Sequence, residues 1–350
     1  MKNILLTGGL GYIGSHTCIS LIEGGYNIFI LDSLLNSNIS VLERLNLIKK
    51  NLKVNNKCFI KFFKGDIRDR KLINEIFNYS KAINYSIDAV IHLAGLKSII
   101  QSNQTPKIYW NVNVEGTKIL IDSMDENNCK TIIFSSSATV YGNSKEKIIK
   151  ESCEINPINN YGISKANAEK VLFEKYSNSQ GWRVINLRYF NPIGAHKSYL
   201  IGEIPNKNAT NLFPFICKAA IKEIEYIKIY GKEWDTKDGT CIRDFVHVLD
   251  IASGHLAALN YLIKKDKIFK SINLGTAKGT TVLELVKIFE EVIEKKINFS
   301  FFNKREGDVS SLVASNDLAL KILNWKPKHT IEEMCIDGWN WFLNKNKEKA

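Results

Sequence analysis

The chain has 350 residues, of which 45 % are hydrophobic and 24 % charged, proportions that describe a globular protein with a real core and exclude a disordered chain. This length favours two domains that share a cleft. The formal net charge of +12 suits an anionic ligand such as a nucleotide; it would also suit a nucleic acid, but the Lys residues are mixed with Asn and Ile, so we interpret them as solvated surface.

The cysteines and the apolar runs indicate the compartment. Seven cysteines are scattered without a CxxC pair or a His/Cys cluster, so we expect neither a disulfide framework nor a metal site. No apolar run reaches the length of a membrane span, and the apolar stretch near the start is too short for a signal peptide. We therefore expect a cytoplasmic protein with no membrane and no nucleic-acid partner.

Short apolar runs alternate with helical patterns through the first half of the chain. Four of these runs predict strands: Asn3–Thr7, Asn27–Leu31, Ala89–Ala94 and Thr131–Ser135. Alternation of this kind predicts a parallel sheet of βαβ units. Because the strands lack polar alternation, helices should cover both faces of the sheet. The expected fold is a doubly wound α/β fold.

Two further strand candidates, Val184–Tyr189 and Ser271–Leu274, flank a more polar stretch that contains several prolines. We expect a second, smaller α/β lobe to be inserted there and completed by the C-terminal part of the chain. The predicted sheet domain spans residues 1–190 and about 243–275, and the smaller lobe spans about 191–242 and 276–345.

A glycine-rich turn, Gly8-Gly9-Leu10-Gly11-Tyr12-Ile13-Gly14, joins the first strand to a helical pattern. Glycines let the backbone approach a pyrophosphate, whose charge the free amides at the helix start stabilise. The second strand ends in Asp32, 18 residues after Gly14. A carboxylate at this place accepts hydrogen bonds from the adenosine ribose and repels a 2′-phosphate, so the pattern predicts NAD rather than NADP.

Two later segments lie where further strands should end, at the edge where open α/β sheets bind ligands. They are Gly65-Asp66-Ile67 and Leu93-Ala94-Gly95. Asp66 suits a hydrogen bond to the adenine amino group, and it equally suits a turn before Arg68; the spacing leaves both interpretations open.

A Tyr161-x-x-x-Lys165 pair follows a strand that ends in serines, the last of them Ser137. On a helix this spacing puts both side chains on one face. A nearby ammonium, together with a positive nicotinamide ring, should lower the pKa of Tyr161 towards the working range and make it a proton acceptor. The Ser137 hydroxyl would share the same substrate oxygen. A chance helix pair is the alternative, which the glycine turn and the serine strand end make weaker.

These motifs resemble those of the extended short-chain dehydrogenase/reductase superfamily and, within it, the UDP-glucose 4-epimerases. Other segments that carry the resemblance are Phe134–Gly142, Arg188–Pro192, Asp238–Val248 and Arg305–Asp308. The resemblance covers nearly the whole chain. It implies a seven-stranded Rossmann domain, a smaller UDP-sugar lobe, a tightly bound NAD that is regenerated in each cycle, and a homodimer.

The resemblance also implies site residues. Its NAD site corresponds to Gly8, Gly11, Tyr12, Ile13, Gly14, Asp32, Asn36, Ser37, Asp66, Ile67, Leu93, Ala94, Gly95, Lys97, Tyr161, Lys165 and Phe190. Its UDP-sugar site corresponds to Lys97, Ser137, Tyr161, Asn191, Asn211, Leu212, Tyr230, Arg243, Arg305, Asp308 and Leu312. Arginines suit phosphates because they form charged hydrogen bonds, although Arg305 equally suits a surface salt bridge.

The implied reaction inverts C4 of a UDP-hexose. Tyr161 takes the C4 hydroxyl proton while the hydride moves to NAD, the 4-keto sugar turns, and the hydride returns to its other face. A 4,6-dehydratase would carry an Asp-Glu pair where this chain has Ala138 and Thr139. An ordinary dehydrogenase would leave the uracil-side residues without a purpose, and a non-catalytic sensor would be expected to lose Tyr161 or Lys165.

Two positions bear on details. In this family the position of Leu312 helps to set the size of the pocket: a bulky aromatic goes with UDP-glucose and UDP-galactose alone, and a smaller residue goes with N-acetylated sugars as well. Leucine is intermediate and weakly favours both substrates, UDP-glucose and UDP-N-acetylglucosamine. Val112 stands where some members carry an Asn that contacts the cofactor.

Overall fold

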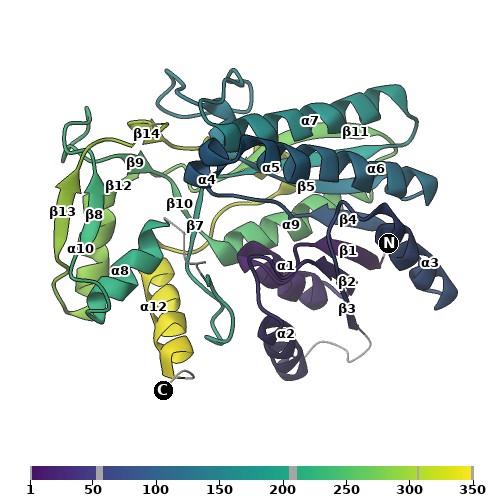
Figure 1. Cartoon of the computed structure of the whole chain (residues 1–350), viewed down its shortest axis with the longest axis horizontal. Coiled ribbons are helices and arrows are strands. Elements are labelled where there is room, and N and C mark those ends of the chain that lie inside the picture. Colours follow the sequence, from purple (N-terminus) through teal and green to yellow (C-terminus); the bar gives the residue numbers. More distant parts are fainter. Residues whose placement is uncertain (1, 53–57, 205–210, 306, 348–350) are drawn as a thin grey trace.

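The computed structural model describes residues 2–52, 58–204, 211–305 and 307–347 (Figure 1). Its centre is a seven-stranded sheet in the order β11-β6-β5-β4-β1-β2-β3, in which every neighbouring pair is parallel. The strands are β1 (Asn3–Thr7), β2 (Asn27–Asp32), β3 (Ile60–Lys64), β4 (Ala89–His92), β5 (Thr131–Ser137), β6 (Arg183–Tyr189) and β11 (Ile268–Leu274). The predicted parallel α/β sheet is confirmed, with β4 ending two residues earlier and β5 two residues later than expected.

Helices cover both faces of this sheet (Figure 1). One face carries α1 (Tyr12–Glu23), α2 (Ser40–Asn51), α9 (Val248–Leu262) and α11 (Asp317–Leu323), and the other carries α3 (Arg70–Ala82), α6 (Gly116–Glu126) and α7 (Asn160–Asn178). Along β1, Ile4 and Leu6 pack in one core cluster and Leu5 packs in the other. Because each face is apolar, the strand shows no polar alternation.

A second group of helices and strands gathers beside the sheet, on the left of Figure 1. A core cluster there is built from α8 (Leu212–Ala220), β8 (Ile227–Tyr230), α10 (Val282–Ile293) and α12 (Ile331–Lys347), and β13 (Phe299–Phe302) pairs with β8. Small sheets connect this part to the large one: β7 (Asn191–Ile193) with β10 (Phe245–His247), and β9 (Ile242–Arg243) with β12 (Thr280–Thr281) and β14 (Ser311–Leu312). The domain boundaries proposed above stay a prediction. Helix α11, which falls within the predicted smaller lobe, packs against α9 and β11 of the large sheet's layers.

Four short helical segments pack against α7. They are α4 (Ile99–Gln104), α5 (Pro106–Trp110), a π-helical turn η1 (Asn111–Glu115) and a 3₁₀ turn η2 (Ala138–Tyr141). Within the described ranges no helix is long and apolar enough to cross a membrane.

The buried carboxylate of Asp244 ties the small sheets to the large one. It lies between β9 and β10 and accepts hydrogen bonds from Thr276 N (2.8 Å), Thr276 Oγ1 (2.6 Å), Ala277 N (3.0 Å) and Ala314 N (3.1 Å). Burial raises the pKa of this carboxyl group. The loop after β11 and the segment after β14 therefore converge on one side chain.

Replacing this side chain should destabilise the fold strongly. We expect Asp244→Ala to cost about 3–5 kcal/mol of unfolding free energy, because one buried and two partly buried amides lose their acceptor. Urea unfolding followed by circular dichroism measures the change. As a control, Asp69→Ala removes the exposed carboxylate that caps α3 and should cost about 1 kcal/mol. Equal urea midpoints for the two variants would contradict this role of Asp244.

Candidate active site

One cavity of about 1040 Å³ runs from the carboxyl ends of the central strands into the second group of elements. Every residue that the sequence analysis assigned to the NAD site or to the UDP-sugar site lines it, and so does Val112. Open parallel sheets bind ligands at this edge. The roles of the individual residues stay predictions, whereas their gathering in one cavity is observed.

The glycine turn leaves no room for side chains. A Cβ on Gly14 would lie 2.2 Å from the Gly8 carbonyl oxygen, and one on Gly8, whose φ is +71°, would lie 2.7 Å from Ala94 N. The turn leads into α1, where Gly11 is the N-cap residue and no side chain caps the first amides. These amides can therefore bind an anion such as a pyrophosphate.

The Asp32 carboxylate at the end of β2 is fixed beside this turn. Its Oδ2 accepts a hydrogen bond from Leu10 N at 2.9 Å, and its Oδ1 accepts from Leu34 N at 2.9 Å and from Ser37 Oγ at 2.8 Å. The side chain is buried but lines the cavity. A glycine turn that excludes a Cβ at Gly8 and Gly14, free helix amides and a fixed carboxylate together fit the adenosine half of NAD.

Asp66 forms the turn before Arg68, which was one of the two interpretations given above for this residue. Its Oδ1 accepts from Arg68 N at 2.9 Å, and its Oδ2 lies 2.7 Å from Arg68 Nη2. Hydrogen bonds from Arg68 lower the pKa of Asp66. Arg68 also reaches Asn111 Oδ1 at 2.6 Å and lines the cavity, which the sequence did not indicate.

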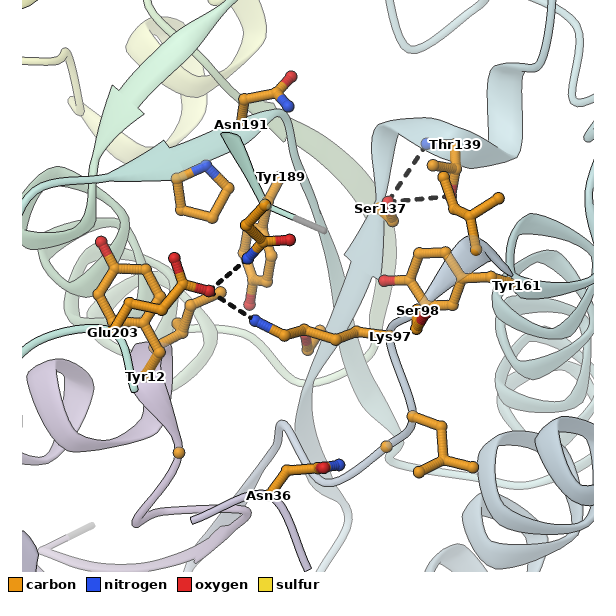
Figure 2. A pocket seen from close by; sticks show the side chains of 18 of the residues that line it. Tyr12, Asn36, Lys97, Ser98, Ser137, Thr139, Tyr161, Tyr189, Asn191 and Glu203 are labelled. Atoms are coloured by element: carbon orange, nitrogen blue, oxygen red, sulfur yellow. Dashed lines mark hydrogen bonds and ion pairs between the residues drawn. The ribbon is translucent and has the colours of Figure 1, made fainter. Parts of the chain in front are cut away.

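The Tyr161-Lys165 pair lies in the first turns of α7, as the spacing predicted. Asn159 caps this helix by accepting from Gly162 N at 2.8 Å. The Lys165 ammonium donates to the Ser135 carbonyl at 2.6 Å and lies 4.8 Å from the centre of the Phe134 ring. Tyr161 and Ser137 lie on the same side of the pocket in Figure 2, and their hydroxyl groups interact.

Burial shifts the pKa values of both Tyr161 and Lys165. Burial raises the pKa of Tyr161 to about 12, and the interaction with Ser137 only opposes this rise. Burial lowers the pKa of Lys165 to about 8, with Glu169 opposing the change. Without a cofactor, loss of solvent thus dominates the pKa of Tyr161, and the lowering expected beside a positive nicotinamide ring stays a prediction.

Asn113 connects the loop after β4 to α7, the helix that carries Tyr161 and Lys165. Its Oδ1 accepts from Leu96 N at 2.8 Å, and its Nδ2 donates to Leu96 O at 3.0 Å and to Ser164 Oγ at 2.9 Å. Ser164 Oγ in turn donates to Tyr161 O at 2.7 Å. Asn113 lies in the π-helical turn η1, a rare conformation that is frequent at functional sites. No sequence motif indicated this contact.

Two arginines and one carboxylate line the part of the cavity away from the sheet. Asp308 lies 2.9 Å from Arg305 Nε and 3.7 Å from Arg243 Nη2. The Arg305 guanidinium also stacks over the Tyr230 ring at 4.7 Å. Arg305 thus forms a salt bridge within the cavity wall. Because two arginines share one carboxylate, Arg243, Arg305 and Asp308 together carry one excess positive charge, which suits a phosphate. Glu306 of the same motif lies outside the described residues.

Glu203 is a cavity residue that the sequence analysis missed. Its Oε1 accepts from Lys97 Nζ at 3.0 Å and from Asn211 Nδ2, and its backbone oxygen accepts from Trp341 Nε1 at 3.1 Å. Figure 2 shows Glu203 and Lys97 reaching towards each other. The carboxylate therefore joins the loop after β4 to the start of α8. It stands in a polar stretch without a motif, so no sequence signal marked it.

An apolar cluster forms the wall behind Ser137. It contains Ala138, Val140, Tyr141, Ile149, Phe190 and Ala314, with Leu312 packed against it. Leu312 pairs with Arg243 across the β14 and β9 strands, so the predicted size-setting residue adjoins a predicted phosphate ligand. Among the described residues no group of His, Cys, Asp or Glu is arranged to hold a metal ion.

Comparison with known proteins shows the family to which the chain belongs. The sequence profile of the GDP-mannose 4,6-dehydratase family matches residues 5–337, and the chain belongs to this family. The chain is 42 % identical over 343 residues to UDP-glucose 4-epimerase 2 of Arabidopsis thaliana. The match covers 98 % of this chain and 95 % of that protein. It is also 42 % identical over 347 residues to the bifunctional protein GAL10 of Pachysolen tannophilus, covering 97 % of this chain and 49 % of that longer protein.

The fold is that of a solved epimerase. A crystal structure of UDP-glucose 4-epimerase from Stenotrophomonas maltophila, with bound NAD and formylated UDP-arabinopyranose, superposes with a TM-score of 0.93 at 37 % identity and covers 99 % of this chain and 100 % of that one. The resemblance to UDP-glucose 4-epimerases that the motifs indicated is thereby confirmed, as is the α/β fold class.

A methyl group in the glycine turn should abolish cofactor retention. Gly14→Ala places a Cβ 2.2 Å from the Gly8 carbonyl, so the turn must open and the amides at the start of α1 lose their arrangement. We expect the purified variant to carry less than about a tenth of the NAD held by the unsubstituted protein, measured after denaturation.

Gly25→Ala serves as the control. Gly25 lies just beyond the other end of α1 with a φ of +82°, and a Cβ added there would meet open space, so this change strains the backbone without touching the turn. It should lower stability by about 1 kcal/mol and leave the NAD content unchanged. Normal NAD content in Gly14→Ala would show that the turn does not hold the cofactor.

Proposed function

We propose that this chain interconverts UDP-glucose and UDP-galactose by inverting C4 of the hexose, with NAD as its cofactor. The observation that carries the proposal is a single continuous cavity that contains the glycine turn with Asp32, the Tyr161-Lys165 pair with Ser137, and the arginines Arg243 and Arg305. A cavity with two anion-binding ends and a proton-transfer group suits a dinucleotide and a nucleotide sugar together.

In this proposal the chain's own residues divide into those that hold the cofactor, those that transfer the proton and those that bind UDP. The glycine turn, Asp32 and the loop at Leu93–Gly95 hold the cofactor. When bound, NAD supplies a positively charged ring near Tyr161 and a reversible acceptor for the C4 hydride. Lys165 holds the nicotinamide ribose and favours the phenolate of Tyr161, which needs nearby positive charge because burial raises its pKa to about 12.

Tyr161 takes the proton of the C4 hydroxyl, and the Ser137 hydroxyl donates to the same oxygen as it becomes the carbonyl of a 4-keto sugar. Arg243 and Arg305 bind the diphosphate, and Tyr230 packs near the uracil. Strong binding of the UDP part allows the sugar to turn without leaving. Tyr161 then returns the proton when the hydride is delivered to the other face, so there is no net redox change.

A sugar-nucleotide 4,6-dehydratase is the second candidate, because the matching family is described by that activity. Elimination of water needs an acid and a base beside the substrate. The two residues after Ser137 are Ala138, which is buried in an apolar cluster, and Thr139, whose hydroxyl bonds to Ser137 Oγ at 2.9 Å. Neither carries a carboxyl group, and this favours the epimerase.

We further propose a cytoplasmic homodimer that forms through the helices around Tyr161. The exposed apolar side chains on this side support the proposal: Ile108 and Trp110 on α5, and Ile163 and Phe173 on α7. All seven cysteines are free, which suits a reducing compartment. Sedimentation equilibrium tests the assembly, and a monomeric mass at micromolar concentration would exclude it.

The decisive experiment incubates the purified protein with UDP-galactose and no added cofactor, and follows the products by NMR. We expect conversion to UDP-glucose. We expect Tyr161→Phe to lower kcat by about 10²–10⁴-fold and to retain bound NAD, because only the proton acceptor is removed. Tyr79→Phe, a change in a partly exposed tyrosine of α3, is the control and should act like the unsubstituted protein.

No conversion of UDP-galactose, even with NAD supplied, would refute the epimerase proposal. Formation of a 4-keto-6-deoxy sugar in the same NMR experiment would favour the dehydratase instead.

Leu312 leads to a proposal on substrate range, namely that the chain also accepts UDP-N-acetylglucosamine and UDP-N-acetylgalactosamine. Leu312→Tyr should narrow the pocket and lower kcat/KM for UDP-N-acetylgalactosamine by about tenfold or more, with a much smaller effect on UDP-galactose. Leu320→Tyr, on the exposed face of α11, is the matched control. No turnover of the N-acetylated sugar by the unsubstituted protein would exclude dual use.

A further inference from the structure

The end of β5 and the catalytic helix meet in a regular arrangement. Three consecutive serines of β5 each contact a residue of α7, and those residues are spaced by four: Ser137 with Tyr161, Ser135 with Lys165, and Ser136 with Glu169. Residues spaced by four on a helix share one face. Glu169 is therefore the third member of a row whose first two members are the proposed catalytic pair.

Glu169 is buried and fully engaged. Its Oε1 accepts from Ser136 Oγ at 2.5 Å and from Arg188 Nε at 2.9 Å, and its Oε2 accepts from Arg188 Nη2 at 2.6 Å. Both partners of this ion pair are almost completely shielded from solvent. A buried pair of this kind costs desolvation energy, so it contributes little to stability compared with apolar residues of the same size.

The pair extends to the other side of Ser137. Arg188 on β6 donates to the Tyr141 hydroxyl at 2.8 Å, and that hydroxyl donates to Asn273 Oδ1 on β11 at 2.7 Å. Tyr141 ends the 3₁₀ turn that begins directly after Ser137. One carboxylate thus restrains the chain before Ser137 through Ser136 and, through Arg188, the chain after it.

We propose that Glu169 is a positioning residue for the reaction: it holds the strand end that carries Ser137 against the helix that carries Tyr161 and Lys165, and it places a negative charge beside the Lys165 ammonium. The inference rests on the proposed roles of those three residues. Glu169 itself does not line the cavity, so it acts through its neighbours.

The surroundings of Lys165 show what the charge does. On its own helix Lys165 faces Tyr161, whose pKa burial raises, and Glu169, which raises the pKa of Lys165 against the effect of burial. On β4 it faces His92, whose pKa burial lowers to about 3, so that ring is neutral. Arg188 on β6 is balanced by Glu169. Removing the carboxylate charge leaves Arg188 unbalanced and makes Lys165 lose its proton more easily.

The test is Glu169→Gln, which keeps an acceptor for Ser136 and removes the charge. Lys165 must be protonated, so activity is lost as the pH rises through its pKa of about 8. We expect the alkaline limb of kcat/KM to move down by about half a pH unit or more, and kcat to fall about tenfold. The KM for UDP-galactose should change less than about twofold, because no cavity contact is lost.

Two further variants separate charge from structure. Ser136→Ala keeps the charge and removes the contact with the strand, so it should lower kcat without moving the alkaline limb. Asp125→Asn breaks the partly exposed ion pair, 2.8 Å long, between Asp125 of α6 and Lys175 of α7. It should change neither kcat nor the alkaline limb. Should Glu169→Gln purify unfolded, the double variant Glu169→Gln/Arg188→Met removes the unbalanced guanidinium and should still move the limb to lower pH.

The outcomes are distinguishable. An unsubstituted protein without epimerase activity would overturn the proposed function and the inference with it. An active protein whose Glu169 variants keep the original alkaline limb, with kcat and KM changed only in proportion to the amount of folded protein, would overturn the positioning role alone.

Discussion

The close approach of Gly14 to the Gly8 carbonyl is the constraint on which the rest of the site depends. It brings the start of α1 directly onto the end of β1, and the contact of Gly8 with Ala94 brings the end of β4 to the same point. Because both strands are central in a parallel sheet, their carboxyl ends meet at one edge. The cavity opens there, and the side chains of β2, β5 and α7 are arranged around it.

The carboxylates in and under this cavity show how a site for two anionic ligands tolerates negative charge. Asp32 accepts from backbone amides, Asp308 lies between arginines, and Glu169 is bound to Arg188. Each charge is held in place by donors that the fold provides. Carboxylates used in this way give geometry at a cost in desolvation.

Much of the fold and of the site could be predicted from the sequence, because the signals are local. Buried strands are continuous apolar runs, a dinucleotide turn requires glycines at fixed spacing, and Tyr161 and Lys165 share a helix face by their spacing. The interactions that were not predicted join distant segments. Lys97 and Glu203 are 106 positions apart, Asn113 and Ser164 are 51 apart, and the pKa of Tyr161 depends on burial by several elements. Such contacts are specified by packing and carry no pattern along the chain.

The burial of β1 from Ile4 to Thr7 has a consequence for how the site can open. Ile4, Leu5 and Leu6 have no exposed surface and lie in the middle of the sheet, with helices on both faces. Segments of this kind open only when the whole domain unfolds, whereas edges and loops open locally. The backbone at the end of such a strand therefore stays in place for as long as the domain is folded, so that hydrogen exchange of these amides reports on global unfolding and not on motion of a loop.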